Sequence, residues 1–329
     1  MHGVNAGEEP VLRKKLRRQD MVAFFTKLPP TMVGIEACGG SHHWARLLQS
    51  LGHQVRMLPP QFVKPYVKRG KNDAADAEAL CEAMSRPTMR FVPVKSPEQQ
   101  AALMLVGLRD RLIRQRTQLA NAIRGYAAEF GLIAATGICR VEPLLERIKA
   151  DDTLPPLARE LFDIHAKDYT QLQARLEEVD DKLMAWHRAD ECSRRLARIP
   201  GVGPIGASML VMKAPALEAF RSARHFAAWL GLTPKDHSTA GKVRLRVITR
   251  AGDEALRSVL VVGATALLQQ VRRGRGSASP WLAALLKRKP PKLAAVALAN
   301  KIARIAWKLM VTGEVYQPQS APPARAHAV

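Results

Sequence analysis

The sequence predicts an α/β domain, then a long antiparallel helical spacer, then a mostly helical C-terminal domain. Three observations support this order. Apolar segments with the lengths of strands and helices alternate up to about residue 95. Two long segments with helical spacing follow, and after residue 191 short helical segments are separated by proline and glycine. We therefore expect four parts, which are residues 1–95, 96–191, 192–316 and a disordered tail at 317–329.

The first part is expected to be a sheet with helices on its faces. Short apolar runs bounded by Pro, Gly or polar residues predict strands, and polar caps followed by apolar residues at helical spacing predict helices. The expected strands are 11–16, 32–36, 54–58 and 89–94, and the expected helices are 21–28, 41–51 and 73–84.

The spacer is expected to contain two long helices. Ser96, Pro97 and Gln99 form a helix start, and this helix should run to about residue 130. The second helix begins after Pro156 and has an apolar seam with heptad spacing in its later part. The seam consists of Phe162, Tyr169, Leu172, Leu176, Val179, Leu183 and Trp186. The two helices can pair within one chain or pack against a second copy, and both arrangements remain open.

Charge is distributed unevenly along the chain. The 51 Lys and Arg against 29 Asp and Glu give a formal net charge of +22. Residues 141–191 hold 13 acids and 7 bases, whereas residues 256–313 hold 11 Lys and Arg and no acid. A basic, foldable chain is typical of a nucleic-acid-binding protein, so the basic C-terminal stretch is the expected phosphate-binding surface. The alternatives are an anionic membrane surface as partner, and charges that only keep helix faces solvated.

The composition argues against several classes of protein. No apolar run is long enough to span a bilayer, and the N-terminus has no apolar signal core. The four cysteines are scattered and show neither metal-ligand spacing nor a disulfide framework. We therefore expect no membrane partner and a reducing, cytoplasmic location.

Three acids of the first part are candidates for a metal site. Glu36 lies at the carboxyl end of an expected strand, which is the edge where open α/β sheets bind ligands. Asp73 and Asp76 are three residues apart and share one face of the next helix. Such a carboxylate set suits Mg²⁺ in phosphoryl transfer. The alternative interpretation is that Asp73 caps the helix and Asp76 is a solvated acid of its first turn.

Two glycine-rich or basic loops are candidates for DNA contacts. The segment 198–206 (RIPGVGPIG) predicts a helix-hairpin-helix, in which Gly201 and Gly203 let the backbone approach a phosphate. A plain turn between two helices is the alternative. The loop between the strand at 54–58 and the helix at 73–84 offers the cations Lys64, Lys68, Arg69 and Lys71.

The segment 237–242 (HSTAGK) places two hydroxyls in a basic loop. Ser238 or Thr239 could attack phosphorus if a base or a metal ion activates the hydroxyl. Ordinary polar turn chemistry is the alternative. Four neighbouring cations can hold phosphate oxygens, and these are Lys242, Arg244, Arg246 and Arg250.

The order of these motifs resembles one family. The strings GIEACGGSHHWAR, PPQFVKPYVKRGKNDAADAEA, IPGVG, FAAWLGLTP, STAGK and ITRAGD follow one another over nearly the whole chain. This combination is similar to the DEDD-type insertion-sequence transposases, which are site-specific DNA recombinases. The resemblance implies a RuvC-like (RNase H-like) N-terminal domain, a coiled coil and a C-terminal transposase domain.

The resemblance also implies site residues and partners. Glu36, Asp73 and Asp76 match the second, third and fourth metal-binding acids of the family, which imply Mg²⁺ or Mn²⁺. A nucleophilic serine that links to DNA would align with Thr239, beside Ser238. The expected partners are donor and target DNA duplexes, a structured guide RNA and further copies of the chain in a dimer or tetramer. The expected location is the bacterial nucleoid.

The sequence departs from the family at its N-terminus. The family's first Asp ends a strand that lies a few residues before the equivalent of His2, and the only acids upstream of Glu36 here are Glu8, Glu9 and Asp20. None of them ends an apolar strand, so we expect the chain as written to have poor activity. The alternatives to a recombinase are a RuvC-like structure-selective nuclease and a nucleic-acid-binding remnant without catalysis.

Overall fold

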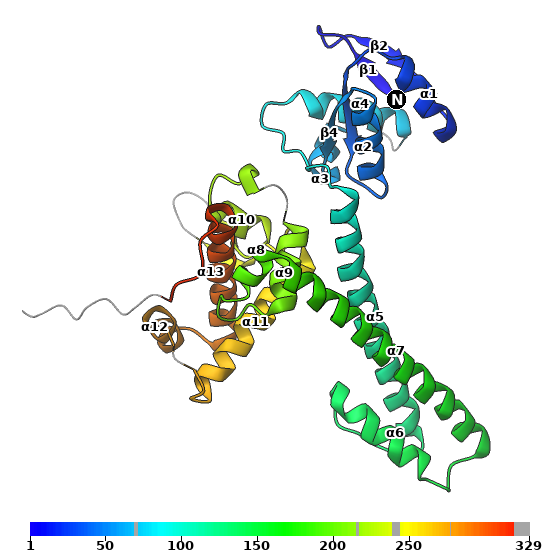
Figure 1. The fold of residues 1–329 in the computed structure, drawn as a ribbon, viewed down its shortest axis with the longest axis vertical. Helices are drawn as coiled ribbons and strands as arrows, with labels where there is room; N and C mark the ends of the chain where they lie inside the picture. The colour runs from blue at the N-terminus through cyan, green and yellow to red at the C-terminus, as the bar shows by residue number, and fades with distance from the viewer. Residues whose placement is uncertain (69–71, 215–216, 239–243, 277, 319–329) are drawn as a thin grey trace, which may run out of the picture. The chain divides into compact units, whose positions relative to one another are not determined.

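The computed structural model describes residues 1–68, 72–214, 217–238, 244–276 and 278–318. The chain divides into two compact units, Met1–Gln100 and Ala101–Val329, which are described separately below (Figure 1). Most of the expected tail, from residue 319 onward, lies outside the described residues.

The N-terminal unit combines short strands with helices. Its strands are β1 (His2–Val4), β2 (Pro10–Arg13), β3 (Met32–Glu36) and β4 (Gln54–Leu58). Its helices are α1 (Met21–Lys27), α2 (Ser41–Ser50), α3 (Pro60–Val63) and α4 (Asp73–Ser85), with 3-10 turns at Arg18–Asp20 and Lys64–Tyr66.

The centre of this unit is a parallel pair of strands. β3 and β4 pair in register from Met32 opposite Gln54 to Glu36 opposite Leu58, and α2 connects them in a β–α–β unit. β1 and β2 form a separate antiparallel hairpin. The alternation expected from the sequence is confirmed for these elements, although the strand expected at 11–16 is the shorter β2.

The prediction of a strand at 89–94 is wrong. Only one isolated bridge forms there, between Val92 and Met57. Val92 donates its amide to the Met57 carbonyl, with nitrogen and oxygen 2.7 Å apart. Pro93 follows directly and has no amide hydrogen, so the run cannot continue as a ladder. In the described residues of this unit, the sheet at the candidate site therefore has two strands rather than three.

Helix α4 covers this pair of strands. Gly34 leaves room for the helix, since a β-carbon there would lie 2.9 Å from the Met84 sulfur. Leu58, Ala79 and Ala83 are buried in the same cluster. Asn72 caps α4, because its side-chain oxygen accepts the Ala75 amide at 2.8 Å.

Two long helices run antiparallel in the following segment. α5 (Pro97–Glu129) begins with the expected reciprocal cap, in which Ser96 and Gln99 each bond the other's amide. α6 (Val141–Lys149) precedes α7 (Pro156–Ala189). Arg109 pairs with Asp180 and Arg116 bonds Gln173, so residue numbers fall along α7 as they rise along α5. The predicted pairing within one chain is present, and contact with a second copy stays a prediction.

The rest of the C-terminal unit is a helical core with one hairpin. Its helices are α8 (Glu191–Leu196), α9 (Pro204–Lys213), α10 (Ala223–Trp229), α11 (Glu254–Arg272), α12 (Pro280–Arg288) and α13 (Pro291–Thr312). A 3-10 turn lies at Leu217–Ala219. The antiparallel hairpin joins β5 (Pro234–Asp236) and β6 (Leu245–Ile248).

Helix α13 lies at the centre of this unit, beside α11 (Figure 1). Small residues allow the close approach, since Ala299, Ala303 and Ala306 of α13 and Ala264 of α11 are fully buried. The longer side chains of the core, such as Phe226, fill the space around them.

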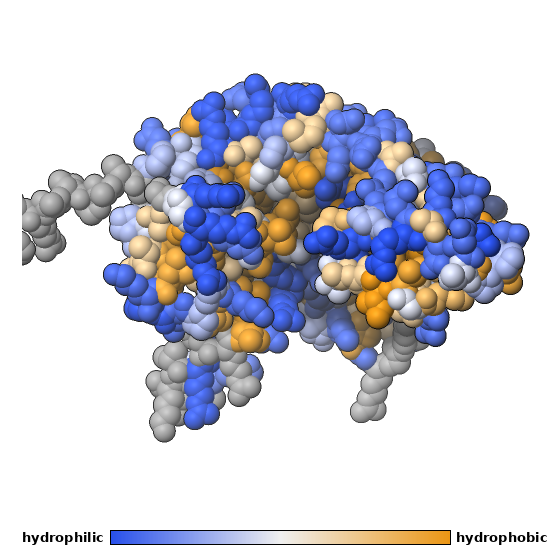
Figure 2. Space-filling view, turned by 90° about the horizontal axis from the view of Figure 1, so that it is seen from below, coloured by the Kyte–Doolittle hydropathy of each residue, from blue (hydrophilic) through white to orange (hydrophobic). Residues whose placement is uncertain are grey.

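The surface is mainly polar. Figure 2 shows hydrophilic residues over most of the face that it presents, with smaller apolar patches between them. In the part of the chain that the structure describes, no helix is both long and apolar enough to cross a membrane. All four cysteines are free thiols.

Candidate functional site

The three predicted carboxylates lie on exposed positions of the N-terminal unit. Glu36 ends β3, at the carboxyl edge of the parallel pair. Asp73 and Asp76 lie in the first turn of α4. Because Asn72 supplies the helix cap, Asp73 is not needed for that role. None of the three side chains makes a hydrogen bond or ion pair with another described residue, so their oxygens are available to a ligand.

A cavity of about 500 Å³ lies at the same edge of the sheet. Cys38, Ser41 and His42 line it, together with the Pro59–Gln61 segment after β4. The Ser41 hydroxyl is buried and has no hydrogen-bond partner among the described residues. Burial, with Lys95 and Arg46 nearby, lowers the pKa of His42, whose Nδ1 accepts the Lys95 amide at 3.1 Å. The edge therefore has space and an unused polar atom in a cavity lined by Ala37, the residue after Glu36.

Whether these residues suit a divalent cation depends on the type of ligand atom and on the geometry. Carboxylate oxygens are the ligands that Mg²⁺ and Mn²⁺ prefer. Within the described residues, however, no three Asp, Glu, His or Cys side chains lie where they could hold an ion together. The donor types therefore fit a metal, whereas this arrangement does not form a closed metal site.

The predicted basic loop is described only in part. Lys64 is exposed in the 3-10 turn after α3. Lys68 pairs with Glu78 of α4 at 2.8 Å, and this contact raises the pKa of the lysine. Arg69 and Lys71 lie outside the described residues. A phosphate at Lys68 would compete with an existing partner, whereas Lys64 has none among the described residues.

The hydroxyl loop lies at the end of the β5–β6 hairpin. The Ser238 hydroxyl donates to the carboxylate of Asp236 and accepts the Arg244 amide at 3.1 Å. The hydrogen bonds that the Ser238 hydroxyl and amide donate to Asp236 lower the pKa of that carboxyl. The sequence interpretation missed Asp236, although an acid two residues before a serine is a recognisable turn signal. Ser238 therefore has both a structural role and an adjacent proton acceptor.

Three of the residues predicted in this loop lie wholly or partly outside the described residues. Thr239 and Lys242 lie outside the described residues, as does the side chain of Arg246. Arg244 is exposed next to Ser238. The choice between Ser238 and Thr239 as nucleophile thus stays open.

The motifs WLGLTP and ITRAGD interlock through their glycines. A β-carbon on Gly252 would collide with the Trp229 carbonyl, and one on Gly231 would collide with the Ala251 backbone. Both glycines also have positive φ angles, +74° and +71°. Arg257 closes the junction by donating to the carbonyls of Leu230 and Ala251. These motifs therefore fix the base of the hairpin that carries the hydroxyl loop.

Arg250 is held in an unfavourable backbone conformation at this junction. Its φ angle is +57°, in the left-handed region that only glycine adopts without cost. Its amide donates to the Gly231 carbonyl at 3.2 Å, and its side chain is exposed. A residue kept in a strained conformation while its side chain faces solvent suggests a functional need for that side chain.

The predicted glycine turn separates α8 and α9, and its two glycines differ. Gly201 has a φ angle of +85° and packs against Gly263 of α11. Gly203 precedes α9, is exposed, and would accept a β-carbon without contact. Only Gly203 is therefore open to a phosphate, while Gly201 serves the packing. DNA binding by this turn stays a prediction.

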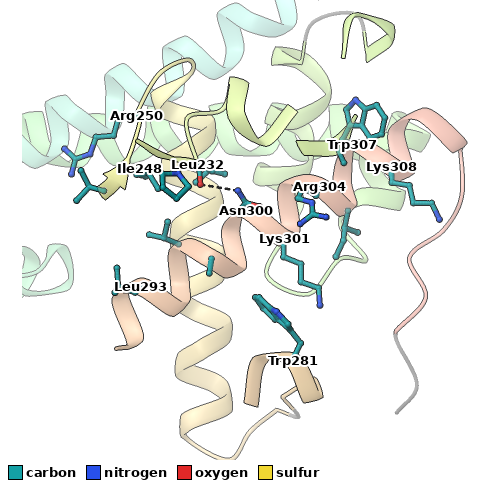
Figure 3. Close-up of a pocket in the computed structure, with 16 residues that line it drawn as sticks. Leu232, Ile248, Arg250, Trp281, Leu293, Asn300, Lys301, Arg304, Trp307 and Lys308 are labelled. Atoms are coloured by element: carbon teal, nitrogen blue, oxygen red, sulfur yellow. Dashed lines mark hydrogen bonds between the residues drawn. The ribbon is translucent and has the colours of Figure 1, made fainter. Parts of the chain in front are cut away.

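A larger cavity, of about 1020 Å³, opens beside the hairpin (Figure 3). Arg250 lines it, as do Trp281 of α12 and Lys301 and Arg304 of α13. The sequence interpretation placed phosphate binding in the acid-free stretch 256–313 but did not single out these last three residues. Their convergence is a tertiary effect, since 20 residues separate Trp281 from Lys301 in the chain.

Two protein-family models match this chain. A DEDD transposase model of the IS110 type matches residues 9–130. A second model, described as the transposase IS116/IS110/IS902 family, matches residues 193–278. The first range holds Glu36, Asp73 and Asp76, and the second holds the glycine turn and the hydroxyl loop.

Relatives that align with nearly the whole chain are also named transposases. A Sinorhizobium fredii protein named as a transposase, y4pF/y4sB, is 71% identical over 96% of this chain and 82% of its own length. The transposase for insertion sequence element IS1328 of Yersinia enterocolitica is 39% identical over 93% of this chain and 91% of its own. The transposase for insertion sequence element IS1111A of Coxiella burnetii is 38% identical over 96% and 87%.

The fold and the matched regions define a transposase of the insertion-sequence class, whose substrate is DNA. The chain belongs to the IS110/IS116 family of transposases, with the family's DEDD domain at its N-terminus and its IS116-type domain toward its C-terminus.

Proposed function

We propose that this transposase cleaves and exchanges DNA strands with a divalent cation, Mg²⁺ or Mn²⁺, and a hydroxyl nucleophile. The proposal rests on the presence of two features in the matched regions. One is a set of exposed carboxylates, Glu36, Asp73 and Asp76, which have no hydrogen-bond or ion-pair partner among the described residues. The other is a hydroxyl loop in which Asp236 accepts a hydrogen bond from the Ser238 hydroxyl.

The carboxylates and the hydroxyl have different roles in this proposal. A bound cation would neutralise phosphate charge and lower the pKa of a coordinated water. Glu36 and the Asp73–Asp76 pair supply the negative charge that attracts the ion to the sheet edge. Asp236 orients the Ser238 hydroxyl and can accept its proton during attack, while the Arg244 backbone amide donates to the same hydroxyl and its exposed side chain can hold a phosphate oxygen.

The test is a strand-cleavage and strand-transfer assay on DNA carrying the ends of the element, with Mg²⁺ or Mn²⁺. Glu36→Gln and Asp76→Asn should abolish both reactions, whereas Glu160→Gln, an exposed acid of α7, should not change either. Removing both hydroxyls, with Ser238→Ala and Thr239→Ala, should abolish transfer.

The alternatives predict other results. A structure-selective nuclease would still cut DNA without Ser238 and Thr239. A nucleic-acid-binding remnant would give the same result with and without Glu36 and Asp76. Either outcome contradicts the proposed function.

A guide RNA is part of the proposal, because the resemblance to the DEDD-type transposases implies one and the net charge of +22 suits a second polyanion. We expect an RNA of defined length to copurify with the chain when the complete element is expressed. Ribonuclease treatment should then abolish sequence-specific DNA binding, and transfer that survives this treatment would contradict the role of RNA. Since DNA is the substrate, we place the reaction at the nucleoid.

An oligomer is also proposed, because an apolar stripe is exposed on α7. Leu157, Leu161 and Ile164 lie on one helix face, with half or more of each side chain exposed. Exposed apolar rows of this kind mark protein contacts. A dimer or tetramer formed through this stripe would bring together the copies needed to act on two duplexes.

A further inference from the structure

The cavity beside the β5–β6 hairpin is walled mainly by the hairpin and by helices α12 and α13, which follow it later in the chain. Pro234, Val247 and Ile248 come from the hairpin, Trp281 from α12, and Lys301 from α13. Asn300 ties two walls together by donating to the Leu232 carbonyl at 3.1 Å. The volume, about 1020 Å³, is at the upper end of the range for small-ligand sites, so the cavity can admit part of a polymer.

The charged residues that line the cavity are all cationic. They are Arg250, Lys301, Arg304 and Lys308. One acid approaches this set among the described residues, Glu314, and it pairs with Lys308 at 3.0 Å. Arg250, Lys301 and Arg304 have no ion-pair partner in the described part of the chain. The cavity therefore favours a ligand that carries several negative charges.

The cavity also exposes apolar surface, which phosphate groups alone would not need. Val247 is 68% exposed, Leu293 is 58% exposed and Trp281 is 38% exposed. Figure 3 shows Lys301 extending from α13 toward Trp281, and its ammonium lies 4.4 Å from the ring centroid. This contact holds a flat aromatic ring next to a positive charge.

A polyanion with flat apolar faces is a nucleic-acid strand with unpaired bases. In a duplex the base faces are stacked and hidden, so a duplex would use the cations but not the exposed ring. Stacking of bases on aromatic side chains, with the backbone on cations, is the general mode of single-strand binding. Since the chain is a DNA transposase, we take the strand to be DNA.

The position of the cavity connects it to the hydroxyl loop. Pro234 pairs with Ile248 at the cavity, and Asp236 pairs with Leu245 at the far end of the hairpin. The two pairs are about 7 Å apart along the strand, at roughly 3.3 Å per residue. Ser238 follows directly after that far end. A strand bound in the cavity would thus pass close to Ser238.

We propose that this cavity binds unpaired DNA next to the site of strand exchange, with a base stacked on Trp281 and phosphates held by Arg250, Lys301 and Arg304. The inference rests on the proposed function, because it gives the strand-exchange loop an opened strand as its substrate.

Binding can be measured apart from catalysis, with the full-length chain in EDTA. The probe is a fluorescent oligothymidylate of about 15 nucleotides, a length that covers one single-strand site. Trp281→Ala should weaken binding about tenfold, the loss typical of one stacked base, and Trp281→Phe should restore most of the affinity. Arg304→Ala should weaken binding as well. The matched control is Lys292→Ala, an exposed α13 residue that does not line the cavity.

Three results would overturn the proposal. The first is unchanged oligothymidylate binding in both Trp281→Ala and Arg304→Ala. The second is a loss of blunt-duplex binding in these variants equal to their loss of oligothymidylate binding, or tighter binding of RNA than of DNA of the same length by the unmodified chain. The third is competition by polyglutamate as strong as that by unlabelled oligothymidylate, which would indicate a general anion surface or an acidic protein partner. Because EDTA removes divalent cations, these binding measurements do not depend on strand transfer. The binding proposal and the proposed function can therefore fail separately.

Discussion

Gly201 and Gly263 pack backbone against backbone. A β-carbon added to Gly263 would overlap the Gly201 carbonyl oxygen, and one added to Gly201 would lie 3.1 Å from the Gly263 carbonyl oxygen. Gly201 belongs to the turn between α8 and α9, whereas Gly263 lies in the middle of α11. The turn therefore fixes the position of α11. The junction of Gly231 and Gly252 at the base of the hairpin lies just before the N-terminus of this helix.

Gly263→Ala should destabilise the C-terminal unit. The added methyl group meets backbone rather than a flexible side chain, so the helix or the turn must move, at a cost of about 1–3 kcal/mol or more. The change is measured by chemical unfolding. Gly203→Ala is the matched control, because its β-carbon would meet nothing within 4 Å. Equal stability of Gly263→Ala and the unmodified chain would contradict the packing.

Gly203→Ala also tests the predicted DNA contact of the turn. Since the fold should tolerate this methyl group, any loss of duplex binding would come from hindered approach of a phosphate to the backbone. We expect weaker duplex binding with an unchanged free energy of unfolding. Unchanged binding would mean that the turn is only a connection between α8 and α9.

Arg250→Gly should separate stability from binding. Glycine relieves the left-handed strain, worth roughly 1–2 kcal/mol, and adds a comparable chain entropy to the unfolded state. The free energy of unfolding should therefore stay within about 1 kcal/mol of the unmodified chain, while DNA affinity falls and the salt dependence drops by about one phosphate contact. Arg250→Ala removes the same charge, keeps the strain and adds no such chain entropy, so its stability should also stay near that of the unmodified chain while its DNA affinity falls. DNA affinity equal to that of the unmodified chain would contradict the role of Arg250.

Local signals in the sequence predicted most of the helices, because caps and breakers act over few residues. The start of α5 follows from Ser96 and Gln99 alone, and the end of β4 follows from Pro59 and Pro60. The missing strand at 89–94 shows the limit of this approach. Its apolar composition fits a strand, but Pro93 removes the donor that a ladder needs.

The sequence could nominate site residues where one segment carries the chemistry. Glu36, Asp73 and Ser238 were nominated from motif and position, and their roles stay predictions. The cavity at Trp281 could not be nominated in this way, because its walls are brought together only by the packing of the hairpin, α12 and α13. The packing role of Gly201 was hidden for the same reason, since its partner Gly263 is 62 residues away.

A buried hydrogen-bond chain joins α7, α8 and α9, and its direction can be deduced. Ser208 donates its only hydroxyl proton to the Pro204 carbonyl, so it must accept from Ser193. Ser193 has then used its own proton, so His187 Nδ1 must donate to the Ser193 oxygen, 2.7 Å away. The histidine is therefore expected to carry a proton on Nδ1.

This histidine should make stability depend on pH. Burial lowers the pKa of His187, assisted by Arg194 and Arg188 and opposed by Asp190. As the pH falls below the ordinary histidine pKa of about 6.5, the unfolded chain takes up the proton first, so stability falls with falling pH. Thermal unfolding between about pH 7.5 and 5.5 should show this loss. His187→Asn keeps a donor near the position of Nδ1 but removes the titrating group, so it should show a smaller loss of stability. Some loss should remain because other histidines still titrate. An identical pH profile in His187→Asn would contradict the assignment.

The exposed stripe on α7 should control the oligomeric state. Leu161 lies between Leu157 and Ile164 and is 50% exposed, so a charge there would be tolerated by the monomer but buried in a contact between copies. Leu161→Glu should therefore shift the mass measured by sedimentation toward the monomer and leave the helical circular dichroism unchanged. Glu160→Gln is the matched control on the neighbouring position and should keep the oligomer. A Leu161→Glu chain that sediments as the unmodified protein does would place the contact elsewhere, and loss of helical signal would show that the stripe belongs to the fold of one copy.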